Sequence, residues 1–177
     1  KKSTWMLNKN FMAEIIKAYD TRRAFIDTLM VLAEKDHRVV LIVPDVGFNY
    51  CEEFQKRFPD RYFNFGVTEQ STMCIAAGMA LSGLRPFVYS MINFVAFRPF
   101  EMVRNLIGLH NAPVVILGVK GSTSYKFLGF SHNMVFEDED IYHLDRYMDC
   151  FIPQNNDEVA HTVMLAYESK KPTYIRL

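Results

Sequence analysis

The chain has 177 residues, of which 50% are hydrophobic and 14% aromatic, enough for one ordinary domain with a substantial core. Twenty Lys and Arg balance twenty Asp and Glu, and this zero formal charge gives no electrostatic basis for binding nucleic acid or an anionic membrane. Three widely spaced cysteines are typical of a reducing cytoplasm, no apolar run reaches the length of a membrane span, and the first ten residues lack the apolar core of a signal peptide. We therefore expect a cytoplasmic protein that has neither nucleic acid nor membrane as its partner.

The first half of the chain alternates helical and extended patterns after an N-terminal extension at residues 1–19. Residues 20–36 have the apolar spacing of a helix, and the β-branched run "VVLIVPDV" at 39–46 is typical of a strand buried on both faces. A short helix up to Pro59 and a short strand at 62–66 follow. The next helix is expected to begin after a capping Thr68 and to end near Gly83.

The second half continues the alternation up to residue 177, so that residues 20–177 are predicted to form one domain. Strands are expected at 85–91, 113–120, 149–154 and 172–177, and helices at 99–110, 138–147 and 156–170. Strands separated by helices predict an α/β fold, a doubly wound and mainly parallel sheet with helices on both faces. Ligands of such sheets bind beyond the carboxyl ends of the strands.

Three loops are therefore the candidate site: the loop after Asp45, the turn at 66–69 and the long loop at 121–137. Loops as long as the third are usually functional in a compact domain. It carries four aromatic side chains that we expect to pack on this domain or on another subunit, namely Tyr125, Phe127, Phe130 and Phe136.

Glu69 opens a helix of small and apolar residues that has no further charge until Arg85. An acid in the first turn is explained by the helix dipole alone. The helix nevertheless has almost no polar face, so we expect it to be buried on most sides. A partly desolvated carboxyl group at its start suits the sharing of a proton with a heterocyclic nitrogen.

The segment "FNFGVTEQSTMCIAAGMALSGLRPFVYSMINFVAFRPFEMVRN" (63–105) resembles the pyrimidine-binding domain of the transketolase family of thiamine-diphosphate enzymes. That family includes transketolase, 1-deoxyxylulose-5-phosphate synthase and the two-chain transketolases of prokaryotes. "GFSH" (129–132), "VVLIVPDVG" (39–47) and "KPTYIRL" (171–177) are similar to further family motifs. The positions that match the central motif are Gly66, Val67, Glu69, Gln70, Ala76, Gly78, Gly83 and Pro86.

The resemblance implies a role for each candidate residue. Glu69, with Gln70 beside it, would bind the ring nitrogen of the aminopyrimidine and stabilise the imino tautomer, whose exocyclic nitrogen removes the thiazolium C2 proton. Phe94 would stack on this ring, and Phe97 is the second candidate, although an ordinary core position explains Phe97 equally well. His132 would bind the substrate. Asp45 would lie near the cofactor at a subunit interface, or it is simply a turn residue at the end of a strand.

The chain lacks the Gly-Asp-Gly motif by which the family holds the diphosphate and its Mg²⁺. The resemblance therefore implies a homodimer of a pyrimidine-binding subunit that pairs with a separate diphosphate-binding subunit and transfers a two-carbon ketol unit between sugars or sugar phosphates. The alternative is a non-catalytic or regulatory domain that keeps the fold and the interface. A nucleotide-binding protein is disfavoured, because neither G-x-G-x-x-G nor a P-loop is present.

The loop at 121–137 departs from the family pattern. Lys120 stands where the family often has a histidine, and aromatic residues replace an acidic pair. This difference predicts an unusual donor or acceptor sugar.

Overall fold

The structure, a computed structural model, describes residues 20–119 and 126–177. Its described residues form a six-stranded sheet in the order β2-β1-β3-β4-β6-β5, in which every neighbouring pair of strands is parallel. The strands are β1 (Val39–Val43), β2 (Tyr62–Asn64), β3 (Arg85–Met91), β4 (Val115–Val119), β5 (Asp149–Phe151) and β6 (Thr173–Arg176). The predicted doubly wound parallel sheet is confirmed, and its strand order reverses between β1 and β3.

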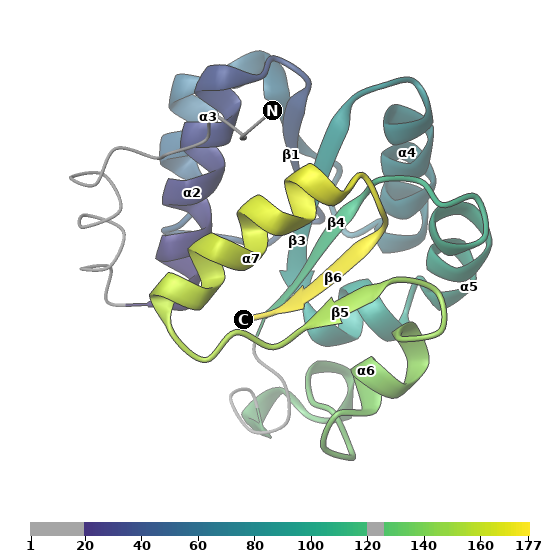
Figure 1. Cartoon of the computed structure of the whole chain (residues 1–177). Helices are drawn as coiled ribbons and strands as arrows, with labels where there is room; N and C mark the ends of the chain where they lie inside the picture. The colour runs from purple at the N-terminus through teal and green to yellow at the C-terminus, as the bar shows by residue number, and fades with distance from the viewer. Residues whose placement is uncertain (1–19, 120–125) are drawn as a thin grey trace.

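Helices cover both faces of this sheet. They are α2 (Thr21–Lys35), α3 (Glu52–Arg57), α4 (Glu69–Leu81), α5 (Phe100–Met102), α6 (Glu139–Leu144) and α7 (Asn156–Ser169). In Figure 1, α2 and α7 lie side by side over one face, while α4 and α5 cover the other. Within the described ranges, none of these helices combines the length and the apolar character needed to cross a bilayer.

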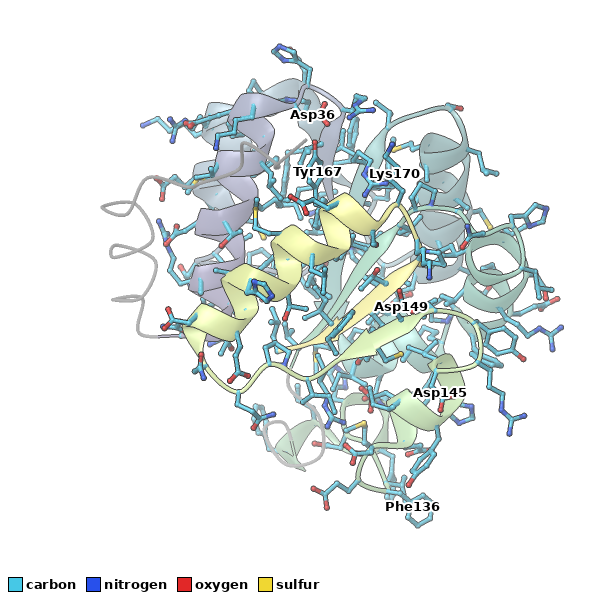
Figure 2. All side chains as sticks on the ribbon, viewed as in Figure 1. Asp36, Phe136, Asp145, Asp149, Tyr167 and Lys170 are labelled. Carbon is cyan, nitrogen blue, oxygen red and sulfur yellow. The ribbon has the colours of Figure 1, made fainter. Side chains whose placement is uncertain are left out.

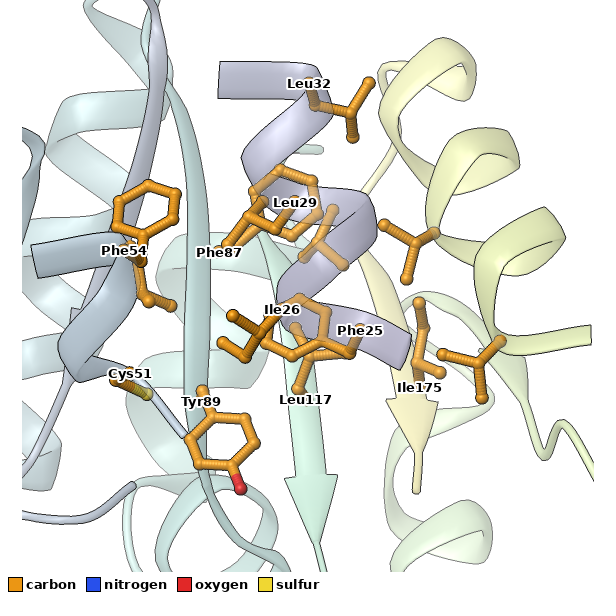
Figure 3. Close-up of a cluster of buried hydrophobic side chains, with 14 of the residues drawn as sticks. Phe25, Ile26, Leu29, Leu32, Cys51, Phe54, Phe87, Tyr89, Leu117 and Ile175 are labelled. Atoms are coloured by element: carbon orange, nitrogen blue, oxygen red, sulfur yellow. The ribbon is translucent and has the colours of Figure 1, made fainter. Parts of the chain in front are cut away.

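The two faces have separate cores because side chains alternate along each strand. In β1, the odd-numbered residues from Val39 to Val43 contact the layer of α2 and α7, whereas Val40 and Ile42 contact the layer of α4. Figure 3 shows the first core, in which Phe25 of α2 packs against the sheet. The ring of Phe25 stacks on that of Tyr89 in β3, with the centroids 5.7 Å apart.

The chain after β3 is helical over a longer stretch than the sequence predicted. A π-helical turn, η2 (Asn93–Phe97), comes first, and the expected helix consists of α5 followed by a second π-helical segment, η3 (Val103–Gly108). The backbone N–H of Arg98 donates to the carbonyl of Asn93 at 2.9 Å, which closes the wide first turn. Such turns are frequent at functional sites, and this one lies directly after the carboxyl end of β3.

Candidate functional site

A pocket of about 500 Å³ opens at the carboxyl edge of the sheet, where the strand order reverses. Its walls come from the segments that follow β1, β2, β3 and β4, together with the start of α2. This is the place where ligands of doubly wound sheets bind. The lining residues are Arg22, Pro44, Asp45, Val46, Gly47, Phe48, Tyr50, Val67, Glu69, Tyr89, Met91, Phe94, Arg98, Val119, Leu128 and His132.

Glu69 reaches this pocket from the first turn of α4. Gly66 precedes it with φ +69°, a conformation that favours glycine and permits the tight turn between β2 and α4. Thr68 occupies the N-cap position as predicted, but its hydroxyl donates to the carbonyl of Phe65 at 2.8 Å and accepts no hydrogen bond from the N–H groups of the helix. The side chain of Glu69 is only 6% exposed, and its Oε1 accepts a hydrogen bond from the guanidinium of Arg98.

Phe94 forms the wall next to this carboxylate. The residue is buried within the turn η2, and the guanidinium carbon of Arg98 lies 4.1 Å from the centroid of its ring. The ring of His132 meets Phe94 edge-on at 5.0 Å between centroids. The structure thus brings together Glu69, Phe94 and His132, three of the residues that the sequence analysis singled out.

Hydrogen bonds join the segment around His132 to the turn η2 and to β6. The side-chain amide of Asn93 donates to the carbonyl of Asn133 at 3.0 Å, and the hydroxyl of Ser131 lies 2.8 Å from Nδ1 of His132. Farther along, the buried carboxylate of Asp140 binds β6 through two side chains that donate to it, the hydroxyl of Tyr174 and the guanidinium of Arg176. These bonds fix the segment relative to the end of the sheet.

Asp45 also lines the pocket, in a left-handed turn with φ +55° after β1. Its backbone N–H donates to Oδ1 of Asn64 at 3.1 Å, and the same oxygen accepts the N–H of Gly66 at 2.9 Å. The side chain of Asn64 therefore holds the loop after β1 and the turn before α4 together. Asp45 is exposed, so it can meet either a ligand or a neighbouring protein surface.

Two of the predicted residues lie away from the pocket lining. Gln70 is exposed, and its amide donates to the carbonyl of Arg98 at 3.5 Å. Phe97 packs against His143, with the ring centroids 5.4 Å apart, and it borders the core on the α4 face of the sheet. Of the two interpretations of Phe97, the structure favours the core position.

Three aromatic side chains of the long loop are largely exposed. Phe127 is 80% exposed and Phe130 87%, and Phe136 points outward at the far end of the loop in Figure 2. The expectation that they pack on another subunit stays a prediction. Lys120 and Tyr125 lie outside the described residues.

The sequence analysis missed a cation at the floor of the pocket. Arg22 lies over the ring of Tyr50, 4.1 Å from its centroid, and its Nε donates to Oδ1 of Asp20 at 2.9 Å. The hydroxyl of Tyr50 donates to the same carboxylate, and these hydrogen bonds, that from Arg22 above all, hold the pKa of Asp20 well below its usual range. In the sequence, Asp20 and Thr21 were both candidates for the cap of the first helix, and neither gave a signal for Arg22.

In the part of the chain that the structure describes, nothing covers the outer face of α4, which is uncharged and partly apolar. Ile75 is 37% exposed and Leu81 60%, and Cys74 and Gly78 are exposed beside them. A Cβ added to Gly78 would have no atom within 4 Å. Among the described residues, only the inner face of α4 is buried, so burial of this helix on most sides would need another protein surface and stays a prediction.

A buried carboxylate and an aromatic wall at the switch point of a doubly wound sheet are features of a ligand-binding α/β domain. The family described as "Transketolase, pyrimidine binding domain" matches residues 17–177. The chain therefore belongs to the transketolase pyrimidine-binding domain family, as the resemblance of its motifs predicted.

Named relatives agree with this assignment. The chain is 31% identical to one of the subunits of the apulose-4-phosphate transketolase of Phocaeicola vulgatus, over 88% of this chain and 50% of that protein. It is 35% identical to a 1-deoxy-D-xylulose-5-phosphate synthase of Bacillus cereus, over 80% of this chain and 22% of that protein. A solved structure described as "Split gene transketolase, inactive beta4 tetramer" matches with a TM-score of 0.77 and 31% identity, over 89% of this chain and 50% of that one. The chain thus spans half or less of the length of each.

Proposed function

We propose that this chain is the pyrimidine-binding part of a thiamine-diphosphate-dependent, transketolase-like enzyme that transfers a two-carbon ketol unit between sugars or sugar phosphates. The observation that carries the proposal is the pairing of a nearly buried carboxylate, Glu69, with an aromatic wall, Phe94, inside one pocket at the strand ends. A flat heteroaromatic ring needs both a stacking face and one in-plane hydrogen-bonding group. Glu69 and Phe94 are the two site residues of the proposal that fit the pyrimidine part of the cofactor.

The residues of this chain would bind and orient the pyrimidine ring, and they would hold one proton beside it. Glu69 holds a proton at the ring nitrogen, Phe94 fixes the plane of the ring, and His132 reaches a hydroxyl or carbonyl of the substrate from the loop beside Phe94. When bound, the cofactor supplies the electron sink for making and breaking the carbon–carbon bond. Asp45 is proposed to lie near the cofactor where a second protein surface closes the pocket.

The diphosphate and Mg²⁺ are assigned to a separate diphosphate-binding subunit or domain. The proposal rests on the absence of Gly-Asp-Gly from the 177-residue sequence. The uncovered face of α4 supports a homodimer, because exposed apolar surface costs about 25 cal/mol per Å² and is removed from water by self-association. With the diphosphate-binding subunit, a heterotetramer is expected.

Replacement of Glu69 tests the proposal. Calorimetry would measure the binding of thiamine diphosphate and Mg²⁺ to the chain assembled with a candidate partner that carries the Gly-Asp-Gly motif. The change Glu69→Gln should lower ketol-transfer activity by at least about 100-fold, the usual range for a group that moves a proton in the transition state. Its thermal unfolding should stay close to that of the unmodified chain, because the side chain lies at a pocket and not in a core.

The matched control is Glu168→Gln, which neutralises an exposed acid of α7. It should change neither binding nor activity. If Glu69→Gln retains activity in the loaded assembly, the assigned role is wrong. If the assembly binds the cofactor tightly but transfers no ketol unit from any sugar tested, the non-catalytic alternative is favoured.

A further inference from the structure

Arg98 holds both surfaces of the site that the proposed function assigns to the pyrimidine ring. Its guanidinium donates to Oε1 of Glu69 and lies over the ring of Phe94 at 4.1 Å from the centroid. The two side chains differ in exposure, because that of Arg98 is 41% exposed and that of Glu69 is 6% exposed. The cation is thus the solvent-exposed partner of the pair, and the carboxylate is the buried one.

A guanidinium has the properties that this site would select in a heteroaromatic ligand. It is planar, it offers N–H donors in its plane to a carboxylate, and it stacks on aromatic faces. A protonated aminopyrimidine meets the same two partners with the same kinds of contact. Arg98 and the ring therefore compete for one place.

We propose, on the basis of the proposed function, that Arg98 is an internal stand-in for the pyrimidine ring and that the ring must displace it to bind. The backbone of Arg98 is held independently of the side chain, by its N–H to Asn93 and its carbonyl to Gln70. The side chain can therefore leave without unwinding the turn η2.

The displacement of Arg98 by the pyrimidine ring sets the affinity of the free chain for that ring. A ligand that binds only the open form has its apparent affinity reduced by the fraction of molecules in which the site is open. Displaced, the guanidinium of Arg98 hydrates at the pocket mouth, while the ring takes over the buried carboxylate, which would otherwise be left unpaired at a high cost. The free chain is expected to bind the ring weakly for this reason, in addition to lacking the diphosphate site.

The experiment uses a probe that needs neither metal nor partner, 4-amino-5-hydroxymethyl-2-methylpyrimidine. Its binding to the full chain would be followed by nuclear magnetic resonance titration or by calorimetry. The change Arg98→Ala should tighten binding about tenfold, which corresponds to about 1.4 kcal/mol. It should also increase the rise in melting temperature that the probe produces, since this variant leaves Glu69 without its cation.

Three further variants separate the contributions. Arg104→Ala removes an exposed guanidinium whose Nε donates only locally, to Asn105 at 2.8 Å, and should leave binding unchanged. Arg98→Lys keeps the positive charge but loses the planar guanidinium group. It should bind the probe with an affinity between those of the unmodified chain and Arg98→Ala. Glu69→Ala should abolish binding in the presence and in the absence of Arg98.

The outcomes distinguish this inference from the function on which it rests. If Arg98→Ala binds the probe no more tightly than the unmodified chain while Glu69→Ala still abolishes binding, Arg98 is no competitor and the proposed function stands. If the probe binds equally well with and without Glu69, or fails to bind any variant, the proposed function fails and the inference fails with it.

Discussion

The two faces of the sheet are covered in different ways at the protein surface. On the face of α2 and α7, the outer surface is charged and paired: Arg23 bonds both Asp27, at 2.9 Å, and Glu53, and Arg57 bonds Glu34. On the other face, the exposed residues of α4 itself are all uncharged, and Ile75 and Leu81 are among them.

This difference shows that a complete core does not imply a complete surface. Both faces bury the residues of the central strands β1, β3 and β4, so the chain has a core on each side of the sheet. Ion pairs at an exposed surface add little stability, but they keep that surface in water. An apolar helix face without them marks a place where another protein surface belongs.

The largest expected effect tests whether the two faces differ in the free chain. Phe25→Ala removes a fully buried ring from the α2 core and should lower the free energy of unfolding by about 3–5 kcal/mol. Leu81→Ala, on α4, should change it by no more than about 0.5 kcal/mol, because the side chain is 60% exposed. Urea denaturation of both variants measures the contrast. A similar loss in both would mean that the outer face of α4 is packed.

A pair of glycines sharpens the comparison. A Cβ on Gly118 in β4 would lie 2.4 Å from the hydroxyl of Tyr174, which is fully buried and bonded to Asp140. Gly118→Ala should therefore lower the free energy of unfolding by about 1–3 kcal/mol through overpacking. Gly78→Ala on α4 should raise it by about 0.5–1 kcal/mol, since alanine is the better helix former and the space is open.

Thermal unfolding of dilute protein measures both glycine variants. The proposed homodimer makes a further prediction for Gly78→Ala. The added methyl group would enter the space that a second copy of the chain would fill. Gly78→Ala should thus stabilise the free chain and weaken its self-association. Unchanged self-association would place the dimer contact elsewhere.

Much of the fold could be predicted because its determinants are local. The β-branched run at 39–46 and the cap at Asp20 each specify an element from neighbouring residues, and the turn at Gly66 locates Glu69. The loop ends then follow from the rule that parallel strands end at one edge. The pocket could be placed in this way before the structure was known.

The rest depends on contacts between distant residues. Arg98 meets Glu69 across 29 positions of the sequence, from the end of the π-helical turn η2. The exposure of Phe127 and Phe130 likewise depends on tertiary contacts and not on their neighbours in the sequence. No periodicity in the sequence encodes either feature.

The smallest expected effect concerns the rates at which cysteines react. The prediction compares one cysteine from each side of the sheet. Cys74 is exposed on α4, whereas Cys51 is buried against the α2 core, and burial raises the pKa of its thiol to about 12. Because the thiolate is the nucleophile, iodoacetamide at pH 8 should modify Cys74 in the free chain and leave Cys51 intact. Cys150 is an internal control, since burial raises its pKa to about 12 as well.

Assembly through α4 should then protect Cys74 alone. Mass spectrometry after timed labelling, at concentrations chosen from sedimentation to give mainly free or mainly associated chain, measures the two rates. Protection of roughly tenfold would mean that about a tenth of the chain is free at that concentration. If Cys74 reacts equally fast in both samples, another surface carries the dimer. If Cys51 reacts as fast as Cys74 in the free chain, the loop before α3 opens readily, and the α2 side of the sheet is then less complete than its ion pairs indicate.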